Sequence, residues 1–171
     1  MTTLLPADAL VVLIGPSGAG KTTFAAGHFS PTQVLSSDAF RGVVSDDPRD
    51  QTATDAAFEL LHAALAMRLA RGRLTVVDAT NVEAWARERL LVAARRHRRP
   101  VVAIVFDLPL STCLERAAAR TDHPVPVAAI RRHHARMRAS LDRLPAEGFD
   151  PVIVLSSTRA VETFAAKWDR P

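Results

Sequence analysis

The chain has 171 residues with a formal net charge of +4, and 48% of its residues are hydrophobic. This length and composition suit one domain with its own core, and no apolar run approaches the length of a membrane span. Cys113 is the single cysteine, which excludes an intramolecular disulfide and a cysteine-based metal site. We therefore expect one domain over residues 1–171. Because the N-terminus also lacks a signal-peptide pattern, we expect a cytoplasmic location without membrane contact.

Short apolar runs alternate with longer amphipathic patterns along the chain. This alternation is typical of an α/β fold in which helices cover both faces of a parallel sheet. Five strands are predicted, at residues 10–14, 33–36, 74–78, 101–106 and 152–155. Helices are predicted at residues 21–28, 54–71, 83–97, 111–120, 127–144 and 160–168.

Two helical patterns follow one another within residues 111–144, with no strand between them. Residues 121–126, which contain two prolines, separate the two patterns. A helical hairpin inserted after the fourth strand is typical of a mobile lid over a binding site. We therefore interpret residues 111–144 as a lid.

Residues 15–22 read GPSGAGKT and lie between the first predicted strand and the first predicted helix. They match the phosphate-binding loop (P-loop) pattern G-x-x-x-x-G-K-[ST]. In such a loop the glycines let successive N–H groups surround a phosphate chain, and the dipole of the following helix adds to the attraction. The pattern predicts an ATP-binding site formed by Gly15, Ser17, Gly18, Ala19, Gly20, Lys21, Thr22 and Thr23.

Oxygen ligands for Mg²⁺ are expected at the same edge of the sheet. Lys21 is predicted to bind the β- and γ-phosphates of ATP, and the Thr22 hydroxyl to bind Mg²⁺. Asp78 ends the third predicted strand and can hold a water on Mg²⁺, as a Walker B aspartate does. Thr80 and Asn81 follow and can orient this water or the acceptor. Asn81, and less readily Asp78, can instead cap the next helix.

A second acidic residue, Asp38, follows the second predicted strand directly. Since ligands bind beyond the carboxyl ends of parallel strands, Asp38 is expected beside the γ-phosphate, where it can accept the proton of an alcohol acceptor. Arg41 lies one helical turn further on and can bind an acceptor phosphate or the transferring group. The alternative is structural, with Asp38 as a helix N-cap and Arg41 as its ion-pair partner.

Arginines of the predicted lid are the remaining candidates for phosphate contact. Arg116 and Arg120 share one helix face and can neutralise the transferring phosphoryl group if the lid closes, although a solvated charged face is the alternative. On the second lid helix, Arg131 can reach a polyanionic acceptor. The dense basic run at residues 95–99 closes a helix at the opposite edge of the sheet, so we interpret it as stabilising that helix end.

Taken together, these residues resemble the 5′-hydroxyl polynucleotide kinase domain of the bacterial end-healing enzymes, and more distantly the phage and animal polynucleotide kinases. The resemblance covers nearly the whole chain and rests on residues 15–23, Asp38 with Arg41, residues 78–81, and the lid. It implies a P-loop kinase fold that uses ATP with Mg²⁺. It also implies that Asp38 is the general base, that Arg41 contacts the acceptor phosphate, and that Arg116 contacts the donor phosphates.

The resemblance implies a nucleic-acid partner, namely the 5′-OH ends of RNA or DNA. Family members often carry this kinase beside phosphatase and ligase modules, and neither module occurs in this sequence. One alternative is a P-loop kinase acting on a sugar, nucleoside, antibiotic or nucleotide-sugar. Another is a nucleotide-dependent switch, although the guanine-specific N-K-x-D segment does not occur. Residues 157–159, after the last strand, are the predicted contact for the purine base.

Overall fold

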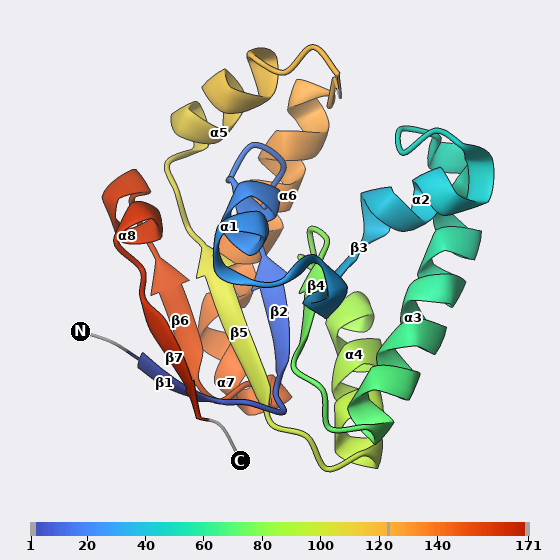
Figure 1. Cartoon of the computed structure of the whole chain (residues 1–171). Coiled ribbons are helices and arrows are strands. Elements are labelled where there is room, and N and C mark those ends of the chain that lie inside the picture. The colour runs from blue at the N-terminus through green and yellow to red at the C-terminus, as the bar shows by residue number, and fades with distance from the viewer. Residues whose placement is uncertain (1–2, 123, 170–171) are drawn as a thin grey trace.

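The computed structural model describes residues 3–122 and 124–169, so His123, in the predicted break between the lid helices, lies outside it. Its centre is a parallel five-stranded sheet with the strand order β3-β4-β2-β5-β6 (Figure 1). These strands are β2 (Leu10–Ile14), β3 (Val34–Ser36), β4 (Thr75–Asp78), β5 (Val101–Phe106) and β6 (Val152–Leu155). All five predicted strands are thereby confirmed.

Helices pack on both faces of this sheet. They are α1 (Lys21–His28), α2 (Ser37–Ser45), α3 (Thr54–Ala70), α4 (Ala84–Arg96), α5 (Leu110–Ala118), α6 (Val127–Ser140), α7 (Leu144–Glu147) and α8 (Thr158–Glu162). Short 3₁₀ turns lie at Pro31–Gln33, Gln51–Ala53 and Leu141–Arg143. None of the helices among the described residues is long and apolar enough to cross a bilayer.

The core consists of two hydrophobic clusters, one on each face. Because side chains alternate along a strand, Val11 and Leu13 of β2 contribute to one cluster, and Val12 contributes to the other. The first cluster includes Phe24 of α1, and the second includes Leu65 of α3. Figure 1 shows α1 over one face and α6 and α7 behind the other. The sheet is therefore buried on both sides, as its apolar strands predict.

The C-terminal part differs from the prediction. The predicted helix at residues 160–168 is wrong, because α8 ends at Glu162 and residues 166–169 form a strand, β7 (Ala166–Asp169). This strand pairs in parallel with β1 (Thr3–Pro6) to make a separate two-stranded sheet. Pairing between the two ends of the chain overrides local helix propensity, and a local pattern cannot show it.

Two further helices differ from the prediction. The helix α2 was not predicted; it begins after Ser36, whose side chain accepts a hydrogen bond from the Ala39 N–H. The N-cap is therefore Ser36 and not Asp38, which lies in the first helical turn. The second lid helix ends at Ser140, and a 3₁₀ turn separates it from α7.

The register of the sheet brings the predicted site residues to one edge. Leu13 of β2 and Ser36 of β3 both lie opposite Asp78 of β4. The P-loop, the start of α2 and the segment after β4 therefore leave the sheet side by side. Figure 1 shows α5 and the start of α6 beyond this same edge.

Candidate nucleotide-binding and phosphotransfer site

A cavity of about 1320 Å³ opens at this edge of the sheet. Its lining comes from the P-loop and α1, the starts of α2 and α3, the end of β4, the lid helices and α8. Pockets for small ligands usually measure roughly 300–1,000 Å³. The cavity is thus larger than one small ligand needs, which suits a nucleotide together with an acceptor.

The backbone of the P-loop depends on glycines at two positions. Gly18 and Gly20 have φ angles of +81° and +92°, a backbone region that residues other than glycine rarely adopt. Gly20 is also the N-cap of α1, whose first turn contains no acidic residue. A side chain at Gly18 would in addition collide with the backbone carbonyl of Cys113 in α5. The loop therefore depends on glycine for its conformation, and it ends at a helix N-terminus, which attracts anions.

Lys21 is a buried cation within this loop. Its Nζ donates hydrogen bonds to the carbonyls of Gly15 at 2.8 Å and Pro16 at 2.9 Å, and only 8% of the residue is exposed. Burial lowers the pKa of the Lys21 ammonium, while the nearby Asp78 carboxylate opposes this effect. A phosphate chain in the cavity would supply the negative charge that favours the ammonium form.

Thr22 and Asp78 meet at the floor of the cavity. The Thr22 hydroxyl donates a hydrogen bond of 2.8 Å to Oδ2 of Asp78. Burial raises the pKa of Asp78, and Lys21 and this hydrogen bond oppose that shift. Hydroxyl and carboxylate oxygens are ligands that suit Mg²⁺. Among the described residues, no three histidine, cysteine or acidic side chains are grouped so that they could hold a metal by themselves.

Asp38 and Arg41 form an ion pair across one turn of α2, and both line the cavity. The Asp38 side chain is 45% exposed, whereas that of Arg41 is 10% exposed. Nε of Arg41 donates to the Pro48 carbonyl at 3.0 Å, which anchors the guanidinium. The ion pair of the structural alternative is thus present, and it lies in the same cavity as the P-loop.

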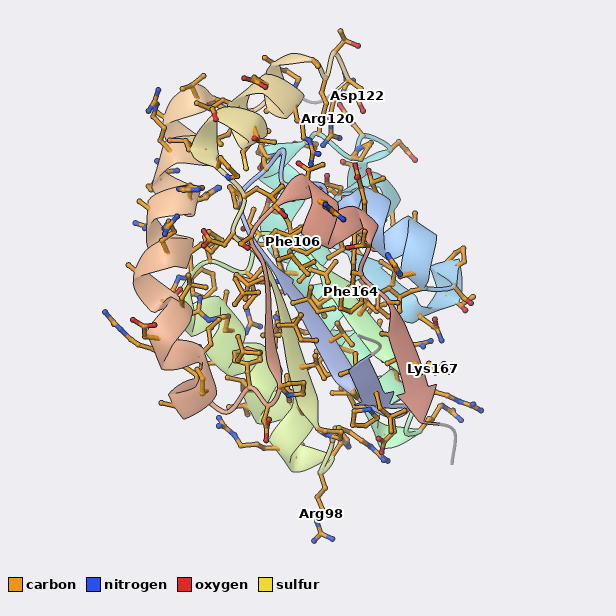
Figure 2. The ribbon with its side chains drawn as sticks, turned by 90° about the vertical axis from the view of Figure 1, so that its left-hand side faces the viewer. Arg98, Phe106, Arg120, Asp122, Phe164 and Lys167 are labelled. Carbon is orange, nitrogen blue, oxygen red and sulfur yellow. The ribbon has the colours of Figure 1, made fainter. Side chains whose placement is uncertain are left out.

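The lid arginines also line this cavity. Arg116 donates to the Thr158 hydroxyl of α8 at 3.4 Å, and Arg120 lies 3.6 Å from Asp122. Thr158 belongs to the stretch predicted to contact the purine base, and it lines the cavity too. Figure 2 shows Arg120 and Asp122 at one end of the molecule and Arg98 at the opposite end. The basic run is therefore remote from the cavity, as predicted.

Two predicted acceptor residues do not line the cavity. Asn81 is 5% exposed, and its amide donates to the Leu13 carbonyl at 2.8 Å, so it is engaged within the protein. Asn81 also does not cap α4, whose N-cap is Glu83. Arg131 is exposed, and the next two residues, Arg132 and His133, line the cavity in its place. Neither residue therefore belongs to the lining of the cavity in this structure, and the order of the strands alone does not predict which side chains reach a cavity.

Sequence reasoning missed several of the lining residues. On α6 these are Ala129, Arg132 and His133, and the buried Nδ1 of His133 has no hydrogen-bond partner in the described structure. Burial lowers the pKa of His133, as do Arg132 and Lys21. Arg132 and His133 lie three and four residues after Ala129, a spacing that places all three on one helix face and that can be read from the sequence. Gln51, in the 3₁₀ turn before α3, and Thr54, the first residue of α3, also line the cavity and belong to no motif.

Comparison with known families decides the classification. A family model described as AAA domain (AAA_33) matches residues 10–144, which include the P-loop, Asp38, Asp78 and the whole of the lid. The chain belongs to this AAA-domain family. No curated protein sequence matches it.

Solved structures with the same fold include chains from three different kinds of protein. A chain of the Pnkp1/Rnl/Hen1 RNA repair complex is 21% identical with a TM-score of 0.68, covering 84% of this chain and 47% of that one. A gluconokinase from Sinorhizobium meliloti 1021 is 19% identical with a TM-score of 0.57, covering 92% and 87%. Kti12 from Chaetomium thermophilum, with ADP-AlF3, is 17% identical with a TM-score of 0.59, covering 90% and 93%.

These likenesses establish the α/β P-loop kinase fold of this AAA-domain chain. They also show that the chain spans about half the length of the matched chain in the RNA repair complex, against most of the length of the gluconokinase. At these identities the fold is shared, and the acceptor has to be argued from the site.

Replacing Lys21 tests the phosphate site. We expect Lys21→Ala to weaken binding of ATP with Mg²⁺ by about 10- to 100-fold, because it removes a charge-assisted contact of about 1.5–3 kcal/mol. Isothermal titration calorimetry measures this change. Lys167→Ala is the matched control, since Lys167 is the other lysine of the chain and is exposed in β7. Equal affinity of the two variants would contradict the assignment.

Substitution by alanine is expected to have opposite effects on stability at two glycines near the site. We expect Gly18→Ala to destabilise the protein, because φ is +81° there and the methyl group would meet the Cys113 carbonyl. Gly27 lies within α1 with no atom within 4 Å of an added Cβ, so Gly27→Ala should stabilise by about 0.5–1 kcal/mol. Urea denaturation of both variants measures the free energies of unfolding. A stable Gly18→Ala protein would show that the loop adopts another conformation.

Proposed function

We propose that this protein transfers the γ-phosphate of ATP to the 5′-OH end of RNA or DNA. The observation that carries the proposal is the Asp38–Arg41 ion pair, which lines the same cavity as Lys21, Thr22 and Asp78. A nucleotide-dependent switch needs the phosphate loop but has no need for a half-exposed carboxylate next to it. The pair therefore favours an enzyme with an alcohol acceptor.

The reaction assigns one task to each group. The acceptor oxygen attacks the γ-phosphorus while Asp38 accepts the hydroxyl proton, and the bond from the γ-phosphorus to the β–γ bridging oxygen breaks to release ADP. Mg²⁺, held by the Thr22 hydroxyl and by Asp78 through water, would offset charge on the β- and γ-phosphates. Lys21 binds the same phosphates, and the P-loop N–H groups orient them.

Arg41 supplies the preference for a phosphorylated acceptor. Its bonds to Asp38 and Pro48 use two of its N–H groups, and a guanidinium has five. The anchored guanidinium is thus oriented in advance, which lowers the entropic cost of binding a phosphodiester next to the acceptor hydroxyl. A nucleic-acid end has this phosphodiester, whereas a free sugar does not.

Residues 111–144 would close over the cavity as a lid in this proposal. Arg116 and Arg120 then neutralise charge on the transferring phosphoryl oxygens, and closure excludes water from the γ-phosphate. We propose Mg²⁺-bound ATP as donor and nucleic-acid 5′-OH ends as acceptor. Phosphatase and ligase activities would have to come from other modules or chains.

A small-molecule kinase is the second candidate. The match to the gluconokinase supports it, because the two chains share the fold over most of both. The two candidates differ in what Arg41 contacts, so they can be separated by the acceptor.

Transfer of labelled phosphate to an oligonucleotide tests the proposed reaction and the role of Asp38 as its general base. With γ-labelled ATP and Mg²⁺, a 5′-OH oligonucleotide should become labelled, and an unlabelled product would refute the proposal. Asp38→Asn should lower kcat by about 10²- to 10⁴-fold, the usual contribution of a general base. Asp55→Asn is the matched control, because Asp55 lies in the first turn of α3 but is exposed outside the cavity. Equal activity of the two variants would remove Asp38 from the mechanism.

An acceptor series tests Arg41. We expect a nucleoside 3′-monophosphate to be a better acceptor than the free nucleoside by about 10-fold or more in kcat/KM, the value of one charge-assisted contact. Arg41→Lys should reduce this preference, because an ammonium cannot reproduce the anchored fork. Competition assays with both acceptors in one tube measure the ratio. A wild-type preference for the free nucleoside, or for gluconate, would favour the small-molecule kinase.

A further inference from the structure

Arg87 of α4 is the most deeply buried charged side chain among the described residues, with 1% of it exposed, and it does not line the cavity. Its Nε and Nη2 each donate to the Glu147 carboxylate of α7 at 2.7 Å. A bidentate ion pair of this kind offsets the desolvation of a buried guanidinium, yet a pair of apolar side chains would serve stability as well. The remaining hydrogen bonds of Arg87 go to the backbone of the turn that follows β4.

Nη1 of Arg87 binds two successive backbone carbonyls. It donates to the Asn81 carbonyl at 3.1 Å and to the Val82 carbonyl at 2.9 Å. Asn81 has a φ of +49°, a left-handed conformation that costs free energy in a residue other than glycine. Arg87 therefore fixes a strained turn at the point where the chain leaves β4.

Residues of the same turn also form hydrogen bonds with the P-loop and with the strand before it. The Asn81 amide donates to the carbonyl of Leu13 at 2.8 Å, and the N–H of Gly15 donates to the Thr80 carbonyl at 3.0 Å. These bonds connect residues 80–82 to the end of β2 and to the first residue of the P-loop. A displacement of this turn moves both the loop and the neighbouring Asp78.

We propose that Arg87 is a positioning residue for the phosphate site, acting through Asn81 on the P-loop. This inference deepens the proposed function and rests on it for the reaction, although its effect on nucleotide binding is independent of the acceptor. Glu147 orients Arg87 and completes the network. Arg136 of α6 also pairs with Glu83, the N-cap of α4, which follows this turn directly.

The inference has a competitor, because a buried ion pair between α4 and α7 can serve stability alone. Arg87→Lys keeps the charge but cannot make all four hydrogen bonds. Asn81→Gly keeps the left-handed turn, which glycine adopts without strain, and removes the amide. Arg95→Lys is the matched control, since Arg95 lies on the same helix and forms an exposed ion pair with Glu88.

The experiment measures the affinity for ATP with Mg²⁺ by calorimetry, well below the melting temperature of each variant, and then KM for ATP and for the acceptor. We expect Arg87→Lys and Asn81→Gly each to weaken nucleotide affinity by roughly 3- to 30-fold, the usual range for a residue that acts through its neighbours. KM for the acceptor should stay unchanged, and Arg95→Lys should match wild type. The double variant should be no weaker than the stronger single variant.

Wild-type nucleotide affinity in both variants, with only a lower melting temperature, would overturn the inference. A higher KM for the acceptor with unchanged nucleotide affinity in Asn81→Gly would also overturn it, since Asn81 would then act on the acceptor. If Arg87→Lys does not fold, Asn81→Gly decides the matter alone. If wild type binds ATP but does not label oligonucleotides, the proposed function fails while the affinities still test Arg87.

Discussion

The hydrogen bond from Thr22 to Asp78 is the interaction on which the site depends. It joins the first turn of α1 to the end of β4, two elements far apart in sequence, and it requires the parallel pairing that places Leu13 opposite Asp78. The P-loop can present its N–H groups only if α1 starts in this position. The core on both faces of the sheet holds that geometry, so the stability of the fold and the shape of the phosphate site have the same cause.

Electrostatics then determine what the cavity binds. Its lining contains basic residues in excess over acidic ones: Lys21, Arg41, Arg49, Arg116, Arg120 and Arg132 against Asp38, Asp78 and Glu162. Lys21 and Asp78 are both buried, and burial acts on the pKa of each against its charged form. A polyanion with a divalent cation supplies charge of both signs, and so it satisfies these two groups together.

The sequence predicts those parts of the site that depend on local backbone chemistry. The P-loop is recognisable because its left-handed glycines and its lysine must follow one another in the chain. Asp78 is recognisable because it ends a strand, and Asp38 because it lies two residues after one. The β1–β7 pairing and the Arg87–Glu147 ion pair join distant segments, so no local pattern predicts them. The hydrogen bond from the Asn81 amide to the Leu13 carbonyl also joins distant segments, so no local pattern predicts it either.

The two halves of the cavity differ in how they are built. The donor half consists of buried groups, Lys21 and Asp78, braced by a network that extends to α7. The proposed acceptor half rests on α2, where Asp38 is half-exposed and Arg41 is anchored by its hydrogen bond to the Pro48 carbonyl. Substitutions in the acceptor half therefore leave the phosphate cradle intact. Such a separation gives a physical reason why one fold can carry different acceptor specificities.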